Sequence, residues 1–267
     1  MPECGRGRVK VELVRFGREC GYEIRITHPA ATLGDYVRAL EALTDEPALT
    51  RRRNPGGACY ACPRCCAERI PITSIDALRL AEIPQAEAPQ PGEERRSPAR
   101  RRGREGGGRA RKPERAAPDR GSRALDAVRR YGWVSVWGRV VDITLRRREA
   151  GECVLLDTGT GLCGEYERRP LVCRTFLCSP LGPVARRLRE AAVNRGQDEL
   201  VRLLLESAGA LGFPINEANK ADLRLEDWQG PNPYRGKTDY DQVPLRDLLP
   251  GSFWRRICPP GKCVDEC

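Results

Sequence analysis

Apolar and polar residues alternate near the start of the chain. The apolar positions on either side of a glycine-containing turn region at 17–21 are Val9, Val11, Leu13, Tyr22, Ile24 and Ile26. This period of two predicts a half-buried β-hairpin over residues 9–26. A helix is predicted after it, because Thr32 and Asp35 form a capping-box pattern ahead of apolar residues at helical spacing. We interpret residues 1–50 as an accessory hairpin and helix.

Three later stretches also carry regular patterns. Ser122 is the predicted cap of a short helix, and a strand-like stretch follows over residues 134–145. Residues 184–208 have helical spacing that is interrupted near Gly196, which predicts two helices or one kinked helix. The region 211–267 is rich in Pro and Gly and is predicted to be a loop-rich extension.

One segment lacks the residues that build a core. No Val, Ile, Leu, Met or aromatic residue occurs from Pro84 to Ala124. Such a segment cannot bury enough surface to offset its ordering entropy, so we predict a disordered insert at 84–121. Residues 95–123 carry 12 basic and 3 acidic side chains, whereas the whole chain has a net charge of +10. The rest of the chain is therefore close to neutral.

Composition narrows the class of protein. The 267 residues are 40% hydrophobic, but no run approaches the roughly 18 apolar residues of a membrane span, so we expect a core and no membrane. The N-terminus lacks the apolar segment of a secretory signal, which predicts a cytoplasmic protein. Arginine-rich tracts can bind RNA, but no aromatic residue lies within this one to stack bases. We therefore do not expect a nucleic-acid partner. The alternative hypothesis is an RNA-associated protein that binds through its basic insert.

The 13 cysteines point to metal or redox chemistry. They fall below the density of about 8–10% that marks a disulfide-rich secreted scaffold. In a reducing compartment, clustered thiols serve metals or redox reactions more often than cross-links. The single histidine, His28, lies far from the cysteine clusters and is interpreted as a residue at a strand end. Metal or catalytic sites that need imidazole are limited to that one side chain.

Two groups of cysteines have the spacing of metal ligands. One is the C-x-x-C-x-x-C-C run, and the other lies about 90 residues downstream. The eight predicted ligands are Cys59, Cys62, Cys65, Cys66, Cys153, Cys163, Cys173 and Cys178. Eight thiolates suit two zinc sites, or one iron–sulfur cluster with spare thiols, and sulfur ligation excludes magnesium and calcium. Small buried cysteines, or a thiol–disulfide switch, are the alternative.

The side chains of adjacent residues diverge, so Cys65 and Cys66 are not expected to complete the same site with the first pair. The C-terminal cysteines Cys258, Cys263 and Cys267 either ligate a further metal, with Cys4 or Cys20 as candidate additional ligands, or belong to a frayed tail.

The context of the cysteines adds further expectations. Four arginines lie close in sequence to the predicted ligands and would offset the charge of thiolates, namely Arg64, Arg168, Arg169 and Arg174. Thr73 and Asp76 form a second capping-box pattern, which predicts a helix that anchors the first cysteine loop. Tyr166 is predicted to be a buried packing residue with a hydroxyl partner. The G-x-G-x-x-G pattern at 159–164 is not expected to bind a dinucleotide, because Pro170 interrupts the long helix that should follow.

Together these motifs resemble the YkgJ-type cysteine cluster family, the C-x-x-C-x-x-C-C zinc- or iron-chelating domain that includes the flagellin lysine N-methylases. The resemblance covers residues 58–180 and rests on the cysteine run, on I-T-S-I-D at 72–76, and on C-G-E-Y-E-R-R-P and C-R-T-F-L-C at 163–170 and 173–178. It implies a metal ion, zinc or an iron–sulfur cluster, as the partner. A metal-dependent protein lysine N-methyltransferase using S-adenosylmethionine is the enzyme alternative.

We therefore predict an α+β fold, a small mixed domain organised around a cysteine-ligated metal site, with a helical C-terminal part. The metal-binding domain is assigned to residues 51–83 and 122–210, on either side of the insert.

Overall fold

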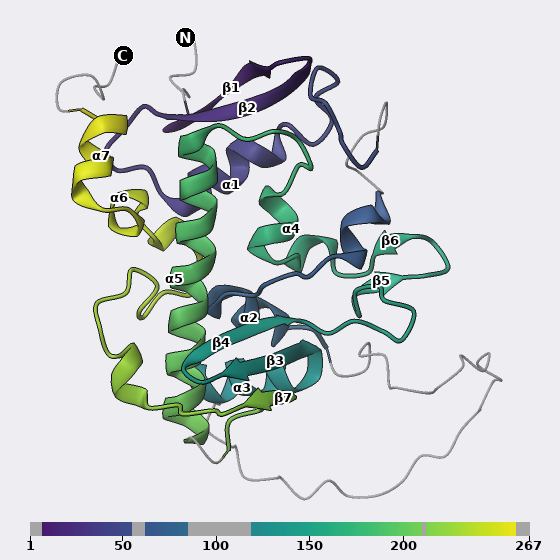
Figure 1. Ribbon diagram of the computed structural model, residues 1–267, viewed down its shortest axis with the longest axis vertical. Helices are drawn as coiled ribbons and strands as arrows, with labels where there is room; N and C mark the ends of the chain where they lie inside the picture. Colours follow the sequence, from purple (N-terminus) through teal and green to yellow (C-terminus); the bar gives the residue numbers. More distant parts are fainter. Residues whose placement is uncertain (1–6, 55–61, 85–118, 210–211, 260–267) are drawn as a thin grey trace, which may run out of the picture.

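Helix α5 (Pro183–Ala208) runs along the molecule and contacts other parts of the fold along its length (Figure 1). The computed structural model describes residues 7–54, 62–84, 119–209 and 212–259. A β-hairpin, a helix and two short C-terminal helices surround one end of α5, and a small sheet with two helices lies at the other end (Figure 1). Helices and small sheets occur together, so the predicted α+β class is confirmed.

The N-terminal hairpin lies where the alternating pattern predicts it. Strands β1 (Val9–Phe16) and β2 (Glu19–Ile26) pair antiparallel along their full length. The turn is shorter than the predicted region 17–21, because pairing resumes at Glu19. Gly17 has a φ of 65°, which glycine adopts without the steric cost of a Cβ.

Two helices begin with the predicted capping boxes. They are α1 (Leu33–Glu41) and α2 (Ser74–Leu80), and the box pairs are Thr32 with Asp35 and Thr73 with Asp76. In each box the threonine side chain accepts a hydrogen bond from the aspartate N–H, and the aspartate carboxylate accepts one from the threonine N–H. These bonds satisfy N–H groups that the first helical turn leaves without partners, which fixes where each helix starts.

A three-stranded sheet packs with α2 and with α3 (Arg120–Tyr131). Its strands, in the spatial order β4-β3-β7, are β3 (Gly132–Trp137), β4 (Val140–Leu145) and β7 (Glu217–Asn219). The prediction of one strand-like stretch over 134–145 is wrong in its continuity. Gly138, with a φ of 60°, turns the chain back, so that β3 and β4 form an antiparallel hairpin.

Two helix predictions are corrected. The cap of α3 is Asp119, whose carboxylate accepts from the Ser122 N–H, so Ser122 lies inside the helix. Helix α5 is continuous through Gly196. A Cβ at that position would lie 2.5 Å from side-chain atoms of Thr73 and 3.1 Å from the ring of Tyr234. The glycine therefore permits a close approach of α5 to two other segments.

The remaining elements are short. The cysteine region contains η1 (Pro63–Ala67), β5 (Leu156–Asp157), β6 (Leu162–Cys163), η3 (Tyr166–Arg168) and α4 (Leu171–Thr175). The C-terminal region contains η4 (Leu225–Trp228), η5 (Tyr240–Gln242), α6 (Leu245–Leu248) and α7 (Gly251–Ile257). Most of the predicted insert, residues 85–118, lies outside the described residues. No helix in the described part of the chain has the length and apolar character needed to cross a bilayer.

Two hydrophobic cores share α5. The hairpin core joins β1, β2 and α1 to the C-terminal helices, and it includes Leu188 and Ala192 of α5. The sheet core joins α2, α3, β3 and β4, and it includes Leu200 and Leu204. Helix α4 contributes to both, because Leu171 is buried in the hairpin core while Val172 and Cys173 pack against the sheet core.

Candidate metal centre

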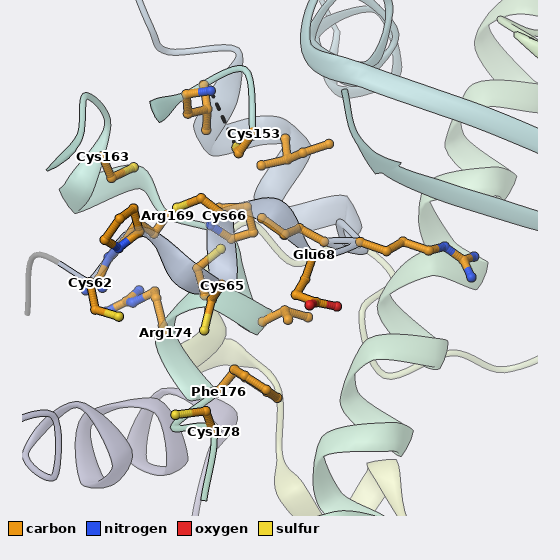
Figure 2. Close-up of a pocket in the computed structure, with 18 of the residues that line it drawn as sticks. Cys62, Cys65, Cys66, Glu68, Cys153, Cys163, Arg169, Arg174, Phe176 and Cys178 are labelled. Carbon is orange, nitrogen blue, oxygen red and sulfur yellow. Dashed lines mark hydrogen bonds between the residues drawn. The ribbon is translucent and has the colours of Figure 1, made fainter. Parts of the chain in front are cut away.

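A cavity of about 500 Å³ lies between η1, the β5–β6 hairpin, α4 and the middle of α5. Seven of the eight predicted ligands line it, namely Cys62, Cys65, Cys66, Cys153, Cys163, Cys173 and Cys178. The eighth, Cys59, lies outside the described residues. In Figure 2, Cys153 and Cys163 lie at one end of the cavity, Cys178 lies beside Phe176 at the other end, and the adjacent pair Cys65 and Cys66 lies between them. The fold thus brings the two distant cysteine stretches to a common space.

Backbone hydrogen bonds join these two stretches directly. The Cys153 N–H donates to the Cys66 carbonyl oxygen at 2.7 Å. Cys66 belongs to η1, which starts with a proline at its first position and uses Cys62 as the N-cap residue. The short helix therefore presents its cysteines next to the loop that carries Cys153.

The β5–β6 hairpin places the next two cysteines. Cys163 ends β6 and pairs with Leu156 of β5. The Leu155 N–H donates to the Sγ of Cys153 at 3.4 Å. An N–H group aimed at a sulfur stabilises negative charge on that sulfur. This hydrogen bond lowers the pKa of the Cys153 thiol, against the larger raising effect of burial.

Helix α4 and the loop after it carry the last two cysteines. Cys173 lies on α4, which follows Pro170. Cys178 has a φ of 45°, a left-handed conformation that is uncommon for residues other than glycine. The neighbouring Leu177 carbonyl oxygen accepts a hydrogen bond from the buried guanidinium of Arg51 at 3.0 Å. The same guanidinium donates to carbonyl oxygens after the end of α1, so it fixes the Cys178 loop against the hairpin core.

Four of the thiols form a set that we call the four-cysteine group, consisting of Cys66, Cys153, Cys163 and Cys173. Cys153 is buried in the sheet core, and the other three pack against that core. Burial raises the pKa of the Cys153 thiol to about 12. It also raises the pKa of the other three thiols, and the nearby thiols of the group raise the pKa of Cys66 and Cys173 further. The four side chains are thus close enough to influence one another's charge.

Cys65 and Cys178 have a different neighbour. Both lie near the guanidinium of Arg53, and their charge contributes to raising its pKa after the larger effect of its hydrogen bond to Glu68. Arg53 also lies over the ring of Phe176, at 5.6 Å from the centroid. Cys65 and Cys66 therefore face different surroundings, as expected for adjacent residues.

Residues 58–195, about half of the chain, match the family model CxxCxxCC, described as a "Putative zinc- or iron-chelating domain". The chain belongs to this family. Searches of curated proteins and of solved structures returned no match. The family assignment confirms the resemblance drawn from the sequence and supports a metal ion as the partner of this CxxCxxCC domain.

The donors at the CxxCxxCC cavity fit the metals that the family description names. Thiolates are soft ligands that suit zinc and iron–sulfur centres, and both kinds of centre accept four cysteines. In the part of the chain that the structure describes, no three His, Cys, Asp or Glu side chains are already close enough together to hold one ion. The chemistry of the donors therefore fits, whereas their convergence on one point stays a prediction.

The arginines that were predicted to offset thiolate charge differ in their contacts. Arg169 lies near Cys163 and lowers its pKa, against the larger raising effect of burial. Its guanidinium stacks on the ring of Tyr166 at 3.5 Å from the centroid. The prediction that Tyr166 is buried is wrong, because its ring is only partly covered at the edge of the cavity. The Arg174 guanidinium instead donates to both carboxylate oxygens of Glu41, at 2.7 and 2.9 Å.

The two other predicted arginines are less involved. Arg64 is exposed, and Arg168 pairs with Glu165 three residues earlier. Arg53 is not among the predicted residues, although it precedes the cysteine run by only six residues and its charge is a signal in the sequence. Glu41 is not among them either, and no local pattern indicates it.

Cysteines and motifs outside the CxxCxxCC cavity have other surroundings. Cys20 lies on β2 and does not line the cavity. Cys258 is buried and disulfide-bonded, whereas Cys4, Cys263 and Cys267 lie outside the described residues. His28 follows the end of β2, and its Nδ1 accepts from the Ala30 N–H. The glycine pattern at 159–164 forms the turn and second strand of the β5–β6 hairpin, where a dinucleotide site would need a long helix.

Proposed function

We propose that the protein binds a zinc ion or an iron–sulfur centre through the four-cysteine group. The observation that carries this proposal is that four separate segments each contribute a cysteine both to the lining of one cavity and to the packing of the sheet core, namely Cys66, Cys153, Cys163 and Cys173. Buried thiols dispersed through a core for packing alone have no reason to gather in this way.

The proposal requires side-chain movements that bring these ligands together, because no three donor side chains in the described residues are close enough to hold one ion. A cysteine side chain has one χ angle, which moves its sulfur between three staggered positions without a change in the backbone. The Cys153–Cys66 backbone bond and the β5–β6 hairpin already hold three of the four segments side by side. Metal binding then replaces thiol protons, and its free energy adds to the stability of the fold.

The test is elemental analysis of the full chain purified anaerobically from medium that contains zinc and iron. We expect bound zinc in a colourless protein, or iron and sulfide in a brown one. Cys66→Ser and Cys173→Ser are expected to lose this metal, because each removes one of four ligands. Cys20→Ser is the control and is expected to keep the wild-type metal content, because Cys20 lies outside the cavity.

Two results would contradict the proposal. One is a folded wild-type protein that contains neither metal. The other is a metal content that falls equally in Cys20→Ser and in the cavity variants, since this would show that the loss does not depend on the four-cysteine group.

A further inference from the structure

Asp76 has a role beyond capping its helix. The carboxylate is fully buried on α2. Its Oδ2 accepts hydrogen bonds from the Thr73 N–H at 2.7 Å and from the Thr73 hydroxyl at 2.8 Å. The first of these bonds belongs to the capping box, and both leave the second oxygen available for other donors.

The second oxygen, Oδ1, reaches two other segments. It accepts from the Leu171 N–H at 2.8 Å, and the hydroxyl of Tyr240 also donates to it. Leu171 is the first residue of α4, which has no side-chain cap of its own, and Cys173 follows two residues later. The carboxylate of α2 thus holds the start of the helix that carries a predicted ligand.

The other capping box shows that this arrangement is not required for helix capping. Asp35 caps α1 through the same bonds to Thr32, but its Oδ1 accepts from the exposed guanidinium of Arg38. Asp35 does not line the cavity. The two aspartates therefore differ in the groups that donate hydrogen bonds to their second carboxylate oxygen.

Tyr240 comes from a part of the chain outside the family match. It is buried, and its ring lies 5.7 Å from the guanidinium carbon of Arg79 and 5.9 Å from that of Arg174. Arg174 directly follows Cys173. Tyr240 therefore contacts the Asp76 carboxylate, which holds the start of α4, and it also lies close to Arg174, which directly follows Cys173.

We propose that Asp76, oriented by the hydroxyl of Tyr240, is a positioning residue that holds the Cys173 thiol in place for metal binding. This inference rests on the proposed function, because it concerns one ligand of the same four-cysteine group. Groups that orient metal ligands commonly contribute about 10–100-fold to metal affinity.

The experiment uses the full chain loaded with Zn²⁺ or Co²⁺. The variants are Asp76→Asn and Tyr240→Phe, of which the second removes only one hydroxyl and keeps the ring that fills the core. Their matched controls are Asp35→Asn, which alters the other capping box, and Tyr234→Phe. Tyr234 is equally buried, but its hydroxyl donates to the Ala192 carbonyl oxygen. The readouts are the rate of Zn²⁺ transfer to a chromogenic chelator and the visible spectrum of the Co²⁺ form.

Both variants are expected to release Zn²⁺ about 10-fold faster than the wild type and to shift the Co²⁺ bands, with circular dichroism unchanged. The controls are expected to match the wild type. Wild-type release rates and spectra in Tyr240→Phe and Asp76→Asn would overturn the inference and leave the proposed function intact. Equal changes in the controls would also overturn it, whereas a wild type that binds neither ion and contains no iron–sulfur centre as purified would refute the proposed function itself.

Discussion

Single residues far from any ligand decide how closely the segments around the cavity approach one another. Gly196 is the clearest case, because α5 passes Thr73 and Tyr234 there with no space for a Cβ. Thr73 is the cap residue of α2, so this contact joins the long helix to the element that carries Asp76. Helical propensity alone disfavours glycine, so the sequence pattern predicts a break or kink in the helix at this residue.

Gly196→Ala is expected to destabilise the protein by about 1–3 kcal/mol, because the added methyl group overpacks the contact with Thr73. The direction of the change in stability is informative, because Gly→Ala at a helix position with space for the methyl group stabilises a protein by about 1 kcal/mol. Urea denaturation followed by circular dichroism measures the change. Gly230→Ala is the control, because a Cβ there meets nothing within 4 Å. A more stable Gly196→Ala protein would contradict this account of the contact.

At the level of elements, the start of α5 depends on a side chain from a distant strand. Gly182 is its N-cap residue and offers no side chain to the first N–H groups. The carboxylate of Glu23 on β2 accepts from the N–H groups of Val184 at 3.1 Å and Ala185 at 2.7 Å. An anion at a helix N-terminus also interacts favourably with the helix dipole. The hairpin thus completes the capping of the longest helix.

Glu23→Ala is expected to lower the free energy of unfolding by about 1–2 kcal/mol, the usual cost of a lost helix cap. Glu12→Ala is the matched control on the facing strand, because Glu12 lies opposite Glu23 and its side chain makes an exposed ion pair with Arg25. Thermal denaturation of the two variants checks the difference. Equal stability of the two would show that the remote cap contributes nothing.

Local patterns predicted the elements that local interactions determine. The hairpin followed from the period of two, and both capping boxes followed from residues three apart. The turn at Gly138 was missed because apolar residues continue on both sides of it. The cap of α3 was placed three residues late, because Asp119 falls at the end of the low-hydrophobicity insert and was counted with it.

The sequence predicts which cysteines line the cavity, but it does not predict which of them lie together. Cysteine spacing identified seven side chains that line one cavity. Spacing could not show that Cys66 lies with the downstream cysteines while Cys65 lies near Arg53, because that division depends on how η1 packs against the loop of Cys153. Glu41 and Tyr240 act across more than 60 residues of sequence, and no local pattern records such contacts.

At the scale of the whole molecule, we predict that the excess positive charge can be removed without a loss of metal binding. Replacing residues 90–115 by a short Gly-Ser linker removes most of the excess positive charge. This range ends before Asp119, so the cap of α3 is kept. Metal content and thermal stability are expected to stay at wild-type values, because the segment has no apolar residues large enough to build a core. Elemental analysis and thermal denaturation provide the check.

A loss of metal on this replacement would contradict the interpretation of the segment as a linker. Binding of RNA by the wild type, lost in the shortened protein, would favour the RNA-associated alternative.

Helix α5 contributes side chains to both hydrophobic cores, and the cavity lies beside its middle. Because both cores need this helix, we expect the two halves of the molecule to unfold as a single cooperative unit. A ligand that binds only the native state, at one site, stabilises it by RT ln(1 + [L]/Kd). Occupancy of the cavity would therefore protect amide hydrogens from exchange as far away as the hairpin and the sheet, and loss of the ligand would loosen both ends together.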